Sequence, residues 1–148
     1  MNKILTFIAN KDKKLLLLKG SPNDPQLKKS IWYVVTGGYE PCDNNLENTV
    51  KREIKEETNL DATKIIYLNW IFEYTSFGKK YIEYAFITFV EDGKIVLNEE
   101  NIVYKWCDLD EFIEKIDWFG DKKILKSVLE KALKEEVLFQ EVVIEKFN

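Results

Sequence analysis

The residues that decide the fold are 37–60, GGYEPCDNNLENTVKREIKEETNL, in a chain of 148 residues. They predict the end of a strand, a pair of glycines, a turn-rich loop and one short acidic helix. Three aliphatic side chains recur at every fourth position of that helix: Leu46, Val50 and Ile54. Because an α-helix turns by about 100° per residue, they form one apolar face that should pack on a core.

Three carboxylates crowd the edge of this apolar face. Glu57 falls inside its arc, Glu53 lies beside it, and Glu56 lies a little further round. Like charges in a partly desolvated place are costly unless a cation compensates them. Arg52, the only arginine, can pair with Glu56 at i,i+4 spacing, but one guanidinium cannot neutralise three carboxylates. The missing charge is most simply a divalent cation with oxygen ligands, Mg²⁺ or Mn²⁺. The alternative is an ordinary solvated acidic helix.

The spacing of these residues resembles the Nudix box, written G-x5-E-x7-R-E-U-x-E-E-x-G-U, where U is aliphatic. The residues that fall on its fixed positions are Gly38, Arg52, Glu53, Ile54, Glu56, Glu57 and Leu60. This resemblance implies the Nudix fold, an α/β/α sandwich with a curved mixed sheet. In that fold the box helix lies against the sheet, and its glycine end faces the substrate cleft.

Two positions depart from the box. Asn59 stands where the family has Gly, which is a mild change because Asn also tolerates the left-handed turn that ends a helix. Asn44 stands where the family has its first Glu, so a carboxylate that would help to hold Arg52 is lost. We expect Asn44 to cap the helix, and either Asp43 or Glu47 to replace the missing carboxylate.

The resemblance also implies a chemistry: hydrolysis of a diphosphate link in a nucleoside diphosphate joined to another group. The implied metal ligands are Glu53, Glu56, Glu57 and the carbonyl of Gly38. Arg52 would orient the carboxylates through charge-assisted hydrogen bonds. Family members differ in the general base, and here both Glu57 and Glu100 are candidates.

Composition excludes several other classes. The chain lacks histidine, which excludes Ser-His and Cys-His hydrolases and His-ligated zinc. A net charge of −4 with scattered lysines argues against a nucleic-acid surface. Cys42 and Cys107 are isolated, as in a reducing cytosol. We find no secretory signal and no run long enough to span a membrane, so we expect a single cytoplasmic domain over residues 1–148.

The flanking sequence predicts mostly strands. Residues 4–9 and 15–18 form an opening hairpin, a polar loop over residues 20–30 follows, and residues 31–36 form a strand that ends at Gly37 and Gly38. Glycine there permits close approach of strand, helix and ligand, so both are assigned to substrate binding.

Aromatic residues alternate along the next strands, residues 64–75 and 81–90. Such side chains usually pack in the core. We nevertheless single out the four that could stack on a base: Trp32, Trp70, Phe72 and Tyr74.

Further on, Tyr104 and Trp106 lie two apart on a strand, and Asp108 begins a helix. This region has a weaker similarity to the branch of the family that includes dATP and dihydroneopterin triphosphate pyrophosphohydrolases. There, a Glu-His pair precedes Tyr-x-Trp. Glu100 holds the Glu position and Asn101 replaces the His. The alternative is that Glu100 belongs to a polar loop tip.

Residues 118–136 predict a closing helix that packs on the core and carries no chemistry. The tail, residues 137–148, either extends that helix or forms a strand, and it offers a surface for a homodimer contact. The favoured function is a metal-dependent pyrophosphohydrolase of a nucleoside triphosphate or a related molecule, without a nucleic-acid or membrane partner. A dinucleoside polyphosphate or nucleotide-sugar hydrolase is an alternative, and so is a nucleotide-binding module that lacks turnover because of Asn44.

Overall fold

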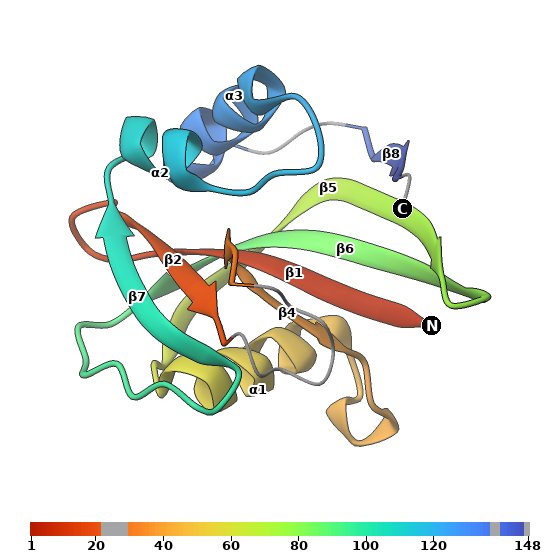
Figure 1. Ribbon diagram of the computed structural model, residues 1–148, viewed down its shortest axis with the longest axis horizontal. Helices are drawn as coiled ribbons and strands as arrows, with labels where there is room; N and C mark the ends of the chain where they lie inside the picture. Colours follow the sequence, from red (N-terminus) through yellow and green to blue (C-terminus); the bar gives the residue numbers. More distant parts are fainter. Residues whose placement is uncertain (22–29, 137–139, 147–148) are drawn as a thin grey trace.

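The computed structural model describes residues 1–21, 30–136 and 140–146, where one open mixed sheet lies between two helical layers (Figure 1). The strands of the described part are β1 (Asn2–Ala9), β2 (Leu15–Gly20), β3 (Trp32–Tyr33), β4 (Val35–Gly38), β5 (Ala62–Ser76), β6 (Lys79–Val90), β7 (Asn101–Cys107) and β8 (Val142–Glu145). Its helices are the short 3-10 helix η1 (Pro41–Asp43), α1 (Leu46–Thr58), α2 (Leu109–Lys115) and α3 (Lys122–Leu133). The expected α/β architecture is therefore confirmed.

The centre of the sheet is β1, which runs parallel to β6 on one side. On its other side the sheet divides. The start of β1 pairs with β4, whereas its last residue, Ala9, pairs with Leu15 at the start of β2. Strand β2 then pairs with β3 and β7. Beyond β6 lie β5, antiparallel to it, and β8, parallel to β5.

This division corrects the expectation of one strand over residues 31–36. Strand β3 pairs with β2, and β4 pairs with β1, with Val34 between them. The two halves have different partners because β2 diverges from β1 immediately after the opening turn. The chain that leads to the glycine pair therefore crosses from one part of the sheet to the other.

The two faces of the sheet carry separate cores. In β1, Ile4 and Ile8 point toward α1, where they pack with Val50 and Ile54 of that helix. Leu5, Phe7 and Ala9 point the other way, into the core beneath α2 and α3. This alternation is the period of two expected of a strand covered on both faces. Figure 1 shows α1 on one side of the sheet and α2 and α3 on the other.

The predicted closing helix is shorter than expected. Helix α3 spans Lys122–Leu133 rather than residues 118–136, because the side chain of Asp121 caps it by accepting a hydrogen bond from the Lys123 N–H. Trp118 and Phe119 therefore lie in the loop between α2 and α3 instead of on a helix. In the tail, β8 confirms the strand alternative, while residues 137–139 and 147–148 lie outside the described part. So do residues 22–29 of the predicted polar loop.

None of the helices in the described residues is long and apolar enough to cross a membrane.

Candidate active site

The loop before α1 places its carboxylate one position earlier than the box does. Asn44 adopts a positive φ of 68° with ψ −34° at the end of η1, a backbone conformation that is uncommon for a residue other than glycine. The extended residue that caps α1 is the next one, Asn45, whose side chain accepts a hydrogen bond from Asn48 N–H at 2.8 Å. The expectation that Asn44 caps the helix is therefore wrong. At the other end, Asn59 adopts the predicted left-handed conformation, with φ 67°.

Asp43 supplies the carboxylate that holds Arg52. The Arg52 Nε donates to Asp43 Oδ1 at 2.8 Å, and Nη2 donates to Oδ2 at 2.9 Å, a bidentate pair. Asp43 also accepts hydrogen bonds from the hydroxyl of Thr49 and the backbone N–H of Glu40. The hydrogen bonds from Arg52 hold the pKa of Asp43 well below its ordinary value. The guanidinium is thereby fixed at the start of α1.

Arg52 in turn connects the helix to the glycine strand. Its Nη2 also donates to the carbonyl oxygen of Gly38 at 2.9 Å, and its Nη1 donates to Glu53 Oε1 at 2.9 Å. The contact to Glu56 Oε1 is longer, at 3.5 Å, and the side chain of Glu56 is more than half exposed. These hydrogen bonds are consistent with the role expected of Arg52, which is to orient the carboxylates.

Gly37 makes room for Glu53. A Cβ atom at Gly37 would lie 2.1 Å from Cδ of Glu53, far inside van der Waals contact. At Gly38 the nearest atom to such a Cβ would be Met1 Sδ at 3.7 Å, an ordinary contact. The close approach of strand and helix therefore requires glycine at position 37, whereas position 38 contributes its carbonyl oxygen.

Glu53 and Glu100 face the same cavity. We name this space the box cavity: it has a volume of about 510 Å³, and its walls include Gly37, Gly38, Glu53, Lys3 and Glu100. Burial raises the pKa of Glu53; Arg52 opposes this effect, and the nearby carboxylates of Glu56 and Glu100 add to it. Glu100, which stands just before β7, thus lines the same cavity as Glu53 of α1.

Glu57 is more deeply buried than Glu53 and Glu56, the other two carboxylates singled out on α1. Its side chain is only 1% exposed, as its place within the apolar arc predicted. The Glu57 Oε1 accepts a hydrogen bond from Asn101 Nδ2 at 3.1 Å, which joins α1 to the start of β7. Asn101 occupies the position at which the similar branch has His, and sequence reasoning did not assign it a role.

The side chains at this end of α1 fit a divalent cation by donor type and charge. Mg²⁺ and Mn²⁺ prefer carboxylate and carbonyl oxygens, and the cavity gathers negative charge around a half-buried glutamate whose pKa is raised by its surroundings. Within the described residues, no three acidic, cysteine or histidine side chains already form a ready-made metal-binding group. Glu53, Glu56 and Glu57 are therefore brought to one end of α1 without being grouped as ligands.

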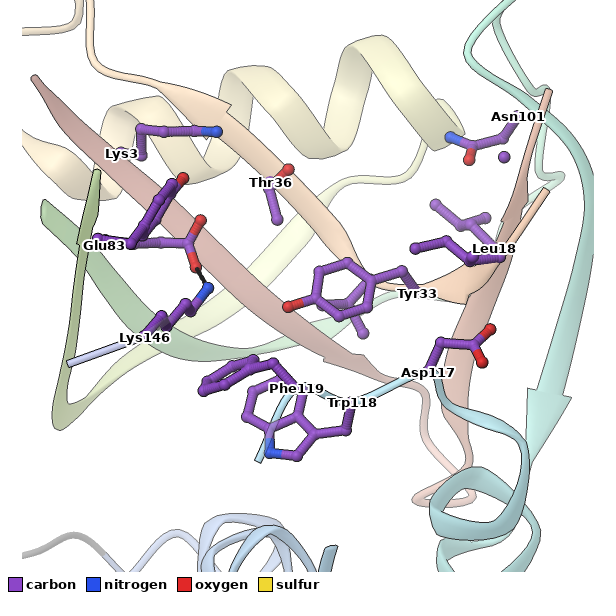
Figure 2. Close-up of a pocket in the computed structure, with 14 residues that line it drawn as sticks. Lys3, Leu18, Tyr33, Thr36, Glu83, Asn101, Asp117, Trp118, Phe119 and Lys146 are labelled. Carbon is purple, nitrogen blue, oxygen red and sulfur yellow. Dashed lines mark hydrogen bonds and ion pairs between the residues drawn. The ribbon is translucent and has the colours of Figure 1, made fainter. Parts of the chain in front are cut away.

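A second cavity opens beside the first. This aromatic cavity has a volume of about 600 Å³, and it shares Lys3, Thr36 and Tyr74 with the box cavity. Figure 2 shows its walls, among them Tyr33, Trp118 and Phe119. The two spaces therefore lie next to each other across three common residues.

The four aromatic residues singled out from the sequence lie in different environments. Tyr74 lines both cavities. Trp70 and Phe72 are 3% and 0% exposed, and both pack against Trp118, so the expectation that they contact substrate is wrong. Trp32 lines neither cavity and lies by Lys19, so its contact with substrate stays a prediction. Trp70 and Phe72 fail because the loop between α2 and α3 covers them.

That loop supplies the residues that sequence reasoning missed. Trp118 and Phe119 come between Asp117 and Gly120, a setting of turn residues that marks a loop rather than a helix. Two large aromatic side chains in such a loop are the signal that could have identified them. Tyr33 was hidden inside a stretch assigned to a single strand.

Comparisons with known proteins agree with this architecture. The family described as NUDIX domain matches residues 2–128. A comparison with curated proteins finds no match.

Among solved structures, the MutT protein from Methanosarcina mazei superimposes with a TM-score of 0.69 at 22% identity, covering 91% of this chain and 94% of that one. The NUDIX domain of Shewanella oneidensis NrtR, solved with ADP ribose, superimposes with a TM-score of 0.69 at 18% identity, covering 90% of this chain and 88% of that one. The dihydroneopterin triphosphate pyrophosphohydrolase of E. coli superimposes with a TM-score of 0.64 at 21% identity, covering 90% of this chain and 95% of that one. At these identities the likeness establishes the fold.

Proposed function

Because the chain belongs to the Nudix family, a family of pyrophosphohydrolases that act on nucleotide derivatives, we propose that it catalyses the metal-dependent hydrolysis of a diphosphate linkage. The substrate is a nucleoside triphosphate or a related nucleoside diphosphate derivative, and the products from a triphosphate are a monophosphate and pyrophosphate. One observation carries this proposal. A cavity with carboxylates on its wall adjoins a cavity with aromatic walls, and Lys3 lines both.

The two cavities divide the substrate between them. A polyphosphate is multiply anionic, so it needs cations where it passes the carboxylates. Lys3 supplies one such cation at the junction, in the cavity that Glu53 and Glu100 also line. The box cavity is the place for the scissile diphosphate, and the ring attached to it extends toward Tyr74 and beyond.

The metal ligands in this proposal are Glu53, Glu56, Glu57 and the carbonyl of Gly38. When bound, Mg²⁺ or Mn²⁺ supplies positive charge to the phosphate oxygens and lowers the pKa of a bound water. Arg52 keeps the carboxylate of Glu53 directed toward the glycine strand through its hydrogen bond to Oε1. The pair with Asp43 holds the guanidinium in place for this task.

Glu100 is the general base that the geometry supports best. It lines the box cavity, whereas Glu57 is buried behind the cavity and bonded to Asn101. In the reaction, Glu100 takes a proton from the attacking water as its oxygen forms a bond to phosphorus. The bridging P–O bond breaks, and its electron pair leaves with the departing phosphate group.

The alternative of a binding module without turnover rested on Asn44. Asp43 contacts Arg52 through both of its oxygens, which supports the view that the missing glutamate has been replaced. Dinucleoside polyphosphates and nucleotide sugars remain substrates to be tested, because the box cavity contacts the diphosphate and not the group attached to it.

The proposal is tested by combining binding and turnover. We expect Mg²⁺ together with a non-hydrolysable nucleotide to raise the melting temperature of the protein, and we expect turnover with the hydrolysable form. Glu57→Gln should keep the fold and lose turnover by orders of magnitude. Binding with no turnover in the unmodified protein would support the binding module instead.

We also propose that the protein works in the reducing cytosol, which agrees with its two free cysteines, Cys42 and Cys107. A homodimer contact through β8 is a further proposal. Val142 and Val143 of this strand are exposed on the outer edge of the sheet. Sedimentation of the protein at several concentrations tests for a dimer.

A further inference from the structure

The aromatic cavity contains a buried ion pair that the proposed reaction does not use. Lys146 Nζ lies 2.7 Å from Glu83 Oε1, and the two side chains are only 11% and 4% exposed. Glu83 comes from the middle of β6 and Lys146 follows β8, so the pair joins residues 63 positions apart. Removing two charges from water is costly, and a buried ion pair is seldom the cheapest way to stabilise a core.

Several contacts fix the position of Lys146 at the wall of the aromatic cavity. The parallel pairing of β8 with β5 continues through Lys146 N–H, which donates to Glu73 O at 2.7 Å. Three aromatic rings surround its ammonium group, at 4.4–5.0 Å from their centroids: Phe72, Tyr74 and Phe119. Cation–π contacts of this kind hold the charged group at the cavity wall.

Stacked aromatic rings form another part of the cavity wall. Tyr33 stacks on Trp118, with an angle of 25° between their rings, and Trp118 also contacts Phe119. Figure 2 shows the Tyr33 hydroxyl directed across the cavity toward Glu83 and Lys146. Burial, with the nearby carboxylate of Glu83, raises the pKa of Tyr33 well above its ordinary value, so the phenol keeps its proton. The cavity therefore combines stacking surfaces with a donor and an acceptor of fixed position.

We propose that the aromatic cavity binds the ring of the substrate, and that Glu83 and Lys146 are specificity-determining residues that contact the edge of that ring. The ligand class is an uncharged planar heteroaromatic ring whose edge presents an N–H donor beside a carbonyl or ring-nitrogen acceptor. Nucleobases and pterins both have this chemistry. This inference rests on the proposed function, because that function supplies the phosphate chain to which the ring is attached.

The charges of the pair argue for this ligand. An ionised carboxylate only accepts hydrogen bonds, and an ammonium only donates them. A ring that offers an N–H to Glu83 and an acceptor to Lys146 satisfies both groups, while the pair as a whole stays neutral. A charged ring would upset that balance in a poorly hydrated place. The volume of about 600 Å³ lies within the range of small-molecule sites, roughly 300–1,000 Å³.

The test uses the ring without its phosphates, so it does not depend on catalysis. Adenosine, guanosine, cytidine, uridine and neopterin are titrated into the ¹⁵N-labelled protein, and the indole N–H signals of Trp118 and Trp106 are followed. Trp106 lies in β7, on the α1 side of the sheet, and serves as the internal control. We expect at least one ring to shift the Trp118 signal and leave that of Trp106 unchanged. Comparing the Trp118 shifts caused by neopterin and by the nucleosides shows whether the preferred ring is a pterin or a nucleobase.

Variants then test the pair itself. Glu83→Gln should weaken binding of the preferred ring about tenfold or more, because a hydrogen bond to a charged group is lost. Since this change leaves Lys146 buried without its counter-ion, the double variant Glu83→Gln/Lys146→Met keeps the cavity neutral and packed, and it should lose ring preference in the same way. Glu135→Gln, which breaks an ion pair with Lys64 on the surface, should leave binding unchanged.

Two results would overturn this inference: no ring shifts the Trp118 signal, or the folded double variant keeps the preference among rings. The outcomes remain distinct from those of the proposed function. Turnover of a triphosphate with unaltered ring preference in the variants would leave the reaction standing and remove the roles of Glu83 and Lys146. Ring binding that depends on the pair, without any turnover, would do the reverse.

Discussion

The box cavity and the aromatic cavity share three residues but differ in what a local motif contributes to each. In the box cavity, Gly37, Gly38 and Glu53 come from one continuous stretch, in which Gly37 and Glu53 meet through a turn and a short helix, whereas the second carboxylate, Glu100, comes from the chain just before β7. The aromatic cavity takes Tyr33, Glu83, Trp118 and Lys146 from four segments spread over the whole chain. A spacing in the sequence therefore specifies the glycine and Glu53 part of the box cavity, whereas the aromatic cavity exists only after the sheet has formed.

The comparison separates chemistry from recognition. A local motif fixes the angles between a strand, a turn and a helix, so it can carry metal ligands that need accurate placement. A cavity made from distant segments can change one wall without disturbing the others, which suits the selection of a ring. We therefore expect changes in the box cavity to affect turnover and changes in the aromatic cavity to affect substrate preference.

The largest effect should follow Glu100→Gln, which removes the proposed base from the box cavity. Proton transfer by a positioned side chain contributes about 10²–10⁴-fold to the rate of a reaction, so we expect kcat to fall within that range. The measurement is steady-state turnover with saturating Mg²⁺. Glu99→Gln, at the exposed neighbouring position, is the matched control and should keep its turnover. A small effect of the Glu100 change would return the role of base to Glu57.

Gly37→Ala tests the contact between strand and helix. The new Cβ would overlap with the side chain of Glu53, and a displacement of about 1 Å near reacting groups can reduce the rate about 10²-fold. Turnover and the Mn²⁺ affinity should both decrease. Gly38→Ala meets only ordinary contacts and should produce a smaller loss. If Gly37→Ala and Gly38→Ala reduced turnover equally, the role of Gly37 in making room for Glu53 would be contradicted.

Asp43→Asn tests whether the carboxylate of the box has moved by one residue. Loss of a group that orients a metal ligand typically costs about 10–100-fold in metal affinity or activity. We expect a loss of this size, measured as turnover against Mg²⁺ concentration. Adding Asn44→Glu to the Asp43→Asn variant should recover part of the activity, since it restores a carboxylate at the family position. Unchanged activity in Asp43→Asn would mean that Arg52 does not need this partner.

Lys3→Met examines the junction of the two cavities. Loss of a charge-assisted hydrogen bond to phosphate should raise KM about tenfold, with little change in the melting temperature. Lys19→Met is the control. Lys19 belongs to β2, its ammonium group lies over the ring of Trp32, and it lines neither cavity. An unaltered KM in Lys3→Met would show that the phosphate chain does not pass this lysine.

The smallest effect concerns stability against pH. Asp43 has a pKa well below its ordinary value in the folded protein. Its ionised form therefore stabilises the fold fully above the unfolded-state pKa of about 4, and this contribution is lost as the pH falls through the lower folded-state pKa. The difference in melting temperature between the unmodified protein and Asp43→Asn should shrink below about pH 4. A constant difference down to pH 2 would contradict the ion pair as its cause.

How much the sequence could predict follows the same division. The apolar arc of α1 correctly predicted the burial of Glu57, and the left-handed turn at Asn59 was also expected. Both depend on helix periodicity or a single backbone conformation. The capping residue was misplaced by one position, because Asn44 and Asn45 are equally good caps and only the end of η1 decides between them.

The aromatic cavity could not be predicted in this way. The period of two in β5 placed Trp70 and Phe72 on one face of the strand, but it did not reveal that Trp118 covers that face. The ion pair of Glu83 and Lys146 depends on the parallel register between β5 and β8, which no local pattern specifies. Residues that meet through long-range pairing remain invisible until the partner of each strand is known.

The most direct test of the central claim is product analysis by ³¹P NMR, with Mg²⁺ at mildly alkaline pH. The panel holds ribonucleoside and deoxynucleoside triphosphates, dihydroneopterin triphosphate, a diadenosine polyphosphate and a nucleotide sugar. We predict that one triphosphate yields a monophosphate and pyrophosphate, and that the reaction stops when EDTA removes the metal. No cleavage of any compound, by a folded protein that binds nucleotide with Mg²⁺, would contradict the claim and favour a binding module.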